Sequence, residues 1–189
     1  MKGSKTSATL LSLAALAAPT AATAATGGVA PPSPGSGSTG GSQVQAPPAP
    51  GHPVSRVARL VRGVAYAPAG APLAVVRAIR AGNRLRNKPY RYGGGHGSFV
   101  DTAYDCSGAV SFALHGGRLL KAPLNSTGFM TWGRSGAGRW ITVYANAGHA
   151  YAVIAGLRFD TSGTGGRGPR WQLDQRDRTG FVARHPAGL

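Results

Sequence analysis

A stretch rich in glycine, proline and serine divides this chain near its first quarter. Between residues 27 and 53, 18 of 27 positions are Gly, Pro or Ser, and none carries a charge. Such a composition cannot bury enough apolar surface to offset the entropy lost when the backbone is ordered. We therefore predict a disordered tether over residues 26–55, which leaves residues 56–189 to form one folded domain.

The first 25 residues have the pattern of a secretory signal. Lys2 and Lys5 precede an apolar run over residues 10–18, and small residues follow at 22–24. The run is about half of the roughly 20 residues that a membrane-spanning helix needs. We predict a signal peptide over residues 1–25, a protein located in the cell wall or outside the cell, and no integral membrane segment.

The charge of the chain limits its partners. The chain has 21 Lys and Arg, five Asp and no Glu. Nineteen of the basic residues and all five Asp lie at or beyond Arg56, so the predicted domain carries a net charge of +14. For a secreted protein we expect anionic partners, namely cell-wall polymers, acidic lipids or the carboxylates of peptidoglycan. No nucleic-acid-binding motif accompanies the charge, so nucleic acid is not an expected partner.

The single cysteine excludes an intramolecular disulfide framework and a multi-cysteine zinc site. The sequence implies no cofactor and no metal, and we expect a monomer.

The pattern of apolar residues predicts an α+β domain. Apolar positions at helical spacing predict a helix over residues 72–87, and a second helix opens at Asp105 and stops at the Gly116-Gly117 pair. Short strands are predicted over residues 140–144, 150–155 and 157–161, with two more at 171–173 and 181–184. Helices followed by a meander of strands indicate an antiparallel sheet.

Three residues could form a nucleophilic site. Cys106 lies near the first turn of the second helix, where the helix dipole favours a thiolate. From position alone it is equally a nucleophile or a small buried core residue. His149 begins a predicted strand after a turn and could act as a general base. Asp160 is chemically the best group to orient that imidazole, and a surface carboxylate beside a turn is its alternative interpretation.

Three segments resemble the signature blocks of NlpC-type cell-wall peptidases, which belong to the papain-like cysteine peptidases. They are PYRYGGG at 89–95, YDCSGAV at 104–110 and GHAYAVI at 148–154. The resemblance covers about residues 73–161. Residues 140–148 lack the Gly-Asp-Leu block usual in the family, which makes this chain a divergent member. The resemblance implies a papain-like core with N-terminal helices, in which the cysteine helix packs on a short antiparallel sheet.

The same resemblance implies hydrolysis of peptide bonds in the stem peptides of peptidoglycan. Cys106 would be the nucleophile and His149 the general base and then acid. The third catalytic position would be Asp160, or Thr161 by an ungapped alignment.

Other residues match the wall of the family's substrate site. They are Tyr90, Asp105 and Ser107, and Asp105 can also act as the helix N-cap. His96, which follows three glycines, could lie at the rim of the cleft, but it is interpreted as a structural loop residue.

Two other functions fit the same residues. One is a non-catalytic, cationic module that binds the cell wall, with Cys106 packed in the core. The other is a papain-like amidase or acyltransferase. Burial of the thiol separates the first from a peptidase, and the mass of the product separates the second.

Overall fold

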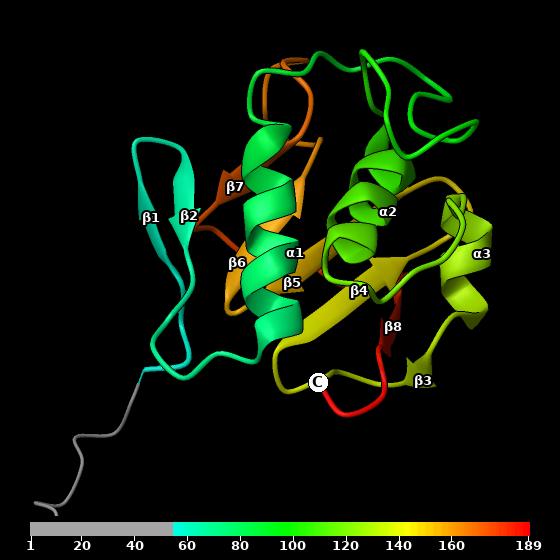
Figure 1. The fold of residues 1–189 in the computed structure, drawn as a ribbon. Coiled ribbons are helices and arrows are strands. Elements are labelled where there is room, and N and C mark those ends of the chain that lie inside the picture. The colour runs from blue at the N-terminus through cyan, green and yellow to red at the C-terminus, as the bar shows by residue number, and fades with distance from the viewer. Residues whose placement is uncertain (1–54) are drawn as a thin grey trace, which may run out of the picture. The chain divides into compact units, whose positions relative to one another are not determined.

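The computed structural model describes residues 55–189. The predicted signal peptide and all but the last residue of the predicted tether lie outside the described residues. Within residues 55–189, every helix is too short or too polar to cross a bilayer. The described part contains a hairpin, three helices and one six-stranded antiparallel sheet (Figure 1).

A β-hairpin that the apolar pattern did not predict opens the domain. Strands β1 (Arg59–Val61) and β2 (Val64–Tyr66) pair antiparallel. The Asn83 side chain accepts a hydrogen bond from the Ala65 N–H at 2.9 Å and donates one to the Ala65 carbonyl at 2.8 Å. Since Asn83 belongs to helix α1 (Leu73–Arg84), these two bonds attach the hairpin to that helix.

Helices α1 and α2 (Cys106–Gly116) lie side by side on one face of the sheet (Figure 1). The predicted C-terminal boundary of α1 at residue 87 is wrong, because the helix ends at Arg84. The chain then tightens into turns, in which Leu85 N–H bonds the Gly82 carbonyl and Lys88 N–H bonds the Leu85 carbonyl. Pro89 prevents the helix from continuing through Lys88, since proline disfavours a helical conformation in the residue before it.

The sheet has the strand order β3-β8-β4-β5-β6-β7, with all neighbours antiparallel. Its strands are β3 (Arg134–Ser135), β4 (Ile141–Ala145), β5 (Ala150–Ile154), β6 (Leu157–Asp160), β7 (Arg170–Gln172) and β8 (Val182–His185). Strands β4 to β7 form the predicted meander, and β8 returns to pair with the free edge of β4. Helix α3 (Ser126–Thr131) and strand β3 were not predicted. The prediction of an α+β fold, with the cysteine helix packed on a short antiparallel sheet, is confirmed.

The two faces of the sheet are filled differently. On the helix side, alternate residues such as Val143, Ala152 and Phe159 join the apolar core beneath α1 and α2. The intervening residues point to the other face and form a second layer. This layer consists of polar, aromatic and charged side chains: Thr142, Tyr144, Tyr151, Arg158 and Asp160. Residues 173–181 cover this layer, because they place Arg176 and Phe181 against the Tyr151 ring.

Candidate active site

Cys106 is the first residue of α2, and the residue before it caps the helix. The Asp105 carboxylate accepts a hydrogen bond from Gly108 N–H at 2.8 Å, and the Asp105 carbonyl accepts one from Ala109 N–H at 3.0 Å. Asp105 thus has the N-cap role that the sequence offered as one interpretation. The thiol therefore lies at the positive end of the helix dipole.

The glycine-rich loop over residues 90–97 packs directly against the start of α2. Asp105 N–H donates to the Gly94 carbonyl at 3.1 Å. A Cβ on Gly108 would overlap the carbonyl oxygen of Gly94. A Cβ on Gly95, whose φ is +81°, would come within 2.7 Å of the Tyr104 ring. The glycines therefore permit a close backbone approach, and this approach holds the loop beside Cys106.

His149 lies immediately before β5, and it faces both Cys106 and Asp160. Its Nε2 is 2.9 Å from Asp160 Oδ1 and 3.3 Å from Ser162 Oγ. The His149 side chain and Ala150 N–H lie near enough to the Cys106 sulfur to lower the pKa of the thiol. Because Nε2 faces Asp160, Nδ1 is the ring nitrogen left for the sulfur. The structure thus brings Cys106, His149 and Asp160 together in one chain of contacts.

The surroundings of the pair favour a thiolate and an imidazolium. Burial raises the pKa of Cys106, but the hydrogen bonds from His149 and Ala150 outweigh it, so the thiol pKa lies below its usual 9.0. Burial lowers the pKa of His149, but its hydrogen bonds to Asp160 and Cys106, and their negative charges, raise it to about 9. Each partner therefore stabilises the charged form of the other.

The pairing register of the sheet decides between Asp160 and Thr161. Strands β5 and β6 pair Ala152 with Phe159 around a two-residue turn, in which Ala155 (φ 46°) and Gly156 (φ 79°) have the positive φ angles of a type I′ hairpin. Extending this register puts His149 and Asp160 on one face and Thr161 on the opposite face. Asp160 is therefore the residue that reaches the imidazole.

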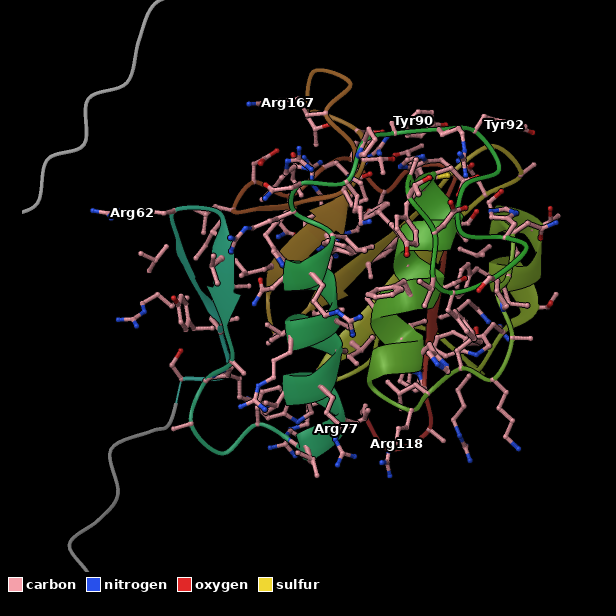
Figure 2. The ribbon with its side chains drawn as sticks, turned by 45° about the horizontal axis from the view of Figure 1, so that its top comes forward. Arg62, Arg77, Tyr90, Tyr92, Arg118 and Arg167 are labelled. Carbon is pink, nitrogen blue, oxygen red and sulfur yellow. The ribbon has the colours of Figure 1, made fainter. Side chains whose placement is uncertain are left out.

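A cavity of about 330 Å³ opens beside Cys106, whose side chain is partly accessible. Its wall comes from the glycine-rich loop, the start of α2, the start of α3 and the turn before His149: Tyr90, Tyr92, Gly93, His96, Asp105, Ser107, Asn125, Ser126, Thr127, Ala147 and Gly148. Figure 2 shows Tyr90 and Tyr92 at the same end of the domain. The three residues predicted to line a substrate site, Tyr90, Asp105 and Ser107, all lie on this wall.

His96, for which a place at the rim of the cleft was the alternative interpretation, lies on this wall. Its Nε2 is 3.0 Å from Asp105 Oδ1 and 3.0 Å from Ser107 Oγ. Asp105 Oδ2 accepts a hydrogen bond from Gly93 N–H at 3.0 Å. Interpreting His96 as a structural loop residue was therefore incomplete, and no local pattern in the sequence predicted its contact with a carboxylate nine residues away.

Comparison with solved structures finds distant likenesses. The P60 domain of an antigen from M. avium subspecies paratuberculosis matches with a TM-score of 0.47 and 22% identity, over 59% of this chain and 93% of that one. The peptidoglycan hydrolase RipB from Mycobacterium tuberculosis matches with a TM-score of 0.46 and 25% identity, over 59% of this chain and 64% of that one. A mutated form of the resuscitation-promoting-factor-interacting protein RipA matches with a TM-score of 0.47 and 22% identity, over 61% of this chain and 65% of that one.

The chain thus spans less than two thirds of the RipB and RipA chains. No protein-family model matches this sequence, and a comparison with curated proteins likewise finds no match.

The site has the groups needed for nucleophilic substitution at a carbonyl carbon. It combines a thiol with a lowered pKa, an imidazole close enough to lower that pKa, and a buried carboxylate bonded to the imidazole. Across residues 55–189, no group of three or more His, Cys, Asp or Glu side chains is arranged to hold a metal ion.

Proposed function

We propose that this protein is a secreted cysteine peptidase that hydrolyses peptide bonds in the stem peptides of peptidoglycan. The observation that carries the proposal is the position of Cys106 on the wall of a cavity and beside His149, whose Nε2 lies 2.9 Å from Asp160 Oδ1. A cysteine that served only as a core residue would need neither a basic partner nor access to a cavity. The choice of stem peptides comes from the resemblance of the three sequence blocks to NlpC-type peptidases.

Acylation uses the thiolate and the imidazolium in turn. The Cys106 sulfur attacks the carbonyl carbon of the substrate peptide, and the carbonyl oxygen takes up the negative charge. His149 then gives its Nδ1 proton to the leaving nitrogen as the carbon–nitrogen bond breaks. The products of this step are a free amine and a thioester on Cys106.

Deacylation reverses the role of the imidazole. Neutral His149 takes a proton from a water molecule, whose oxygen attacks the thioester carbon. The carbon–sulfur bond breaks, the substrate leaves as a carboxylic acid, and the thiolate–imidazolium pair returns. Asp160 keeps Nε2 as the hydrogen-bonded nitrogen throughout, so that Nδ1 remains directed at the sulfur.

The start of α2 supplies the oxyanion donor in this proposal. The first N–H groups of a helix have no acceptor within the helix, and the Cys106 N–H belongs to this first turn. A backbone donor of this kind stabilises the developing negative charge in the transition state. Tyr90 and His96, both on the cavity wall, are the side chains that we expect to contact the substrate peptide. Asp105 and Ser107, which are 4% and 2% exposed, would instead hold His96 in place.

The net positive charge is proposed to retain the enzyme at the anionic wall. Among the described arginines, ion pairs with aspartate involve Arg91, Arg158 and Arg176. Figure 2 shows Arg62, Arg77, Arg118 and Arg167 extending from different sides of the domain. Charge spread in this way supports attraction to a charged polymer mesh in many orientations rather than docking through one face.

The test is digestion of purified peptidoglycan. The native protein and its Cys106→Ala variant are incubated separately with peptidoglycan, and the released fragments are identified by mass spectrometry. We expect new stem-peptide fragments from the native protein alone, and their masses identify the bond that is cut. Release of intact stems cut at the glycan junction would instead indicate an amidase.

The same samples test the non-catalytic alternative. If neither protein releases fragments while both sediment with the wall, the protein is a wall-binding module and the catalytic role of Cys106 is wrong. Sedimentation at increasing salt tests the role of charge, since at about 1 M salt the screening length falls to about 3 Å. We expect both proteins to be released from the wall at high salt.

A further inference from the structure

The carboxylate behind His149 is itself held by a residue from a distant part of the chain. Arg176 Nη1 is 3.2 Å from Asp160 Oδ2, while Asp160 Oδ1 is occupied by His149 and by Ser162 N–H, each at 2.9 Å. The Asp160 side chain is fully buried, with 0% exposed. Arg176 lies outside the three blocks that resemble NlpC-type peptidases, in the segment that follows β7.

Aromatic rings fix the position of Arg176. Its guanidinium carbon lies 5.2 Å from the centre of the Tyr151 ring and 5.1 Å from that of Phe181. The Phe181 ring is edge-on to His149, with centroids 6.3 Å apart. The segment after β7 therefore supplies both a cation to the carboxylate and an aromatic ring to the imidazole.

We propose that Arg176 is a positioning residue, which acts through the Asp160 carboxylate to keep the Cys106–His149 pair in its charged, reactive form. The proposal rests on the proposed function only in calling that form reactive. Its physical basis is that a buried carboxylate needs charged or hydrogen-bonding partners on both oxygens to stay ionised.

The charged groups around the pair lie on several elements. Asp160 ends β6 and is faced by three groups: His149 from just before β5, Arg158 from β6 itself and Arg176 from residues 173–181. Arg158 is the weaker partner of the two, because its Nε lies 3.9 Å from Asp160 Oδ2 and its Nη2 is bound to Asp174 at 2.9 Å. Cys106 faces His149, with Asp105 next to it in sequence and Tyr90 nearby.

Loss of the Arg176 charge is expected to raise the pKa of the Cys106 thiol by either of two routes. Without its positive charge, the ionised Asp160 makes the surroundings of the thiolate more negative, which raises the pKa of Cys106. If Asp160 instead takes up a proton, His149 loses the partner that stabilises the imidazolium, and the thiolate is again less favoured. Both routes move thiolate formation to higher pH.

The experiment measures the pH dependence of Cys106 alkylation by iodoacetamide. The chain has a single cysteine, so the rate reports this thiol alone and needs no substrate. Failure of peptidoglycan hydrolysis would therefore leave this test intact. The midpoint is the pH at which the alkylation rate, rising with pH, reaches half of its plateau. For Arg176→Met, which keeps an apolar stem between the two rings, we expect this midpoint to rise by about half a pH unit or more.

Three further variants separate the proposed role from simple packing. Arg178→Met removes an arginine from the same segment, whose guanidinium lies over the Tyr144 ring at 5.0 Å, and we expect it to leave the midpoint unchanged. Arg176→Lys keeps the charge, so its midpoint should lie much closer to that of the native protein than the midpoint of Arg176→Met does. In an Asp160→Asn background, Arg176→Met should add little further shift, since the carboxylate through which it acts is gone.

Two results would overturn the proposal. One is a midpoint for Arg176→Met that coincides with those of the native protein and of Arg178→Met. The other is a shift of equal size with and without Asp160, which would show that Arg176 acts by packing on the aromatic rings. Circular dichroism of every variant confirms that the measured thiol belongs to a folded domain.

Discussion

Replacing Asp160 by asparagine should cost stability because it leaves buried arginine charge without its carboxylate. The Arg158 side chain is 6% exposed and that of Arg176 is 28% exposed. Removing one partner of a buried ion pair costs about 3–5 kcal/mol, and the partial exposure of Arg176 places Asp160→Asn near the lower end, at about 3 kcal/mol. Urea unfolding can follow this through tryptophan fluorescence, to which Trp171 contributes from the core, where it packs on Phe159 with ring centroids 4.6 Å apart.

Asp174→Asn is the matched control for this change. Asp174 also binds Arg158, at 2.9 Å, but its side chain is 70% exposed. An exposed pair contributes between 0 and about 1 kcal/mol, so Asp174→Asn should destabilise the domain by no more than that. Equal losses of stability in the two variants would refute the reasoning, because burial of the carboxylate would then have no energetic effect.

The difference in stability between the native protein and Asp160→Asn should depend on pH in a direction that follows from the pKa shifts. Burial raises the pKa of Asp160, but the hydrogen bonds from His149 and Ser162 and the charge of Arg176 bring it below 3.8. The stability from this group is therefore complete above pH 3.8 and is lost as pH falls through the folded pKa. For His149, whose pKa is raised from 6.5 to about 9, the contribution is complete below pH 6.5 and is lost as pH rises through about 9. The difference in the free energy of unfolding between the native protein and Asp160→Asn should thus be widest between pH 3.8 and pH 6.5.

Two further predictions concern the thiol and the helix start. His149→Gln should move the acid limb of Cys106 alkylation upward by roughly one pH unit or more, since the imidazolium that stabilises the thiolate is gone; an unchanged limb would refute their contact. Gly108→Ala should destabilise the domain by about 1–3 kcal/mol, because its Cβ would overlap the Gly94 carbonyl oxygen, whereas Gly97→Ala meets nothing within 4 Å and should be neutral in thermal unfolding.

Local patterns were sufficient to predict the helix that begins at Cys106, the proposed nucleophile. Asp105, Cys106 and the glycines around them act within one turn of helix, where capping and close backbone approach are properties of neighbouring residues. The strands of the meander could also be predicted, because alternation and turn residues mark each of them. The β1–β2 hairpin and α3 were missed, since three-residue strands and a six-residue helix carry little periodicity.

The orientation of the third catalytic candidate depends on strand register. Alternation alone allowed Asp160 or Thr161 to face His149. The two-residue turn at Ala155 and Gly156 sets the pairing that puts Asp160 on the side of the imidazole. The sequence contains that turn, so counting outward from it could have resolved the choice.

Sequence by itself thus determined the residues that can do the chemistry, because their reactivity begins with local features such as a helix N-terminus. Only the tertiary structure decided how they are surrounded. Arg176 reaches Asp160, and His96 reaches Asp105, across 16 and nine residues of chain that pass through loops. Such contacts depend on where the covering segments pack on the sheet and the helices, and no local periodicity encodes that packing.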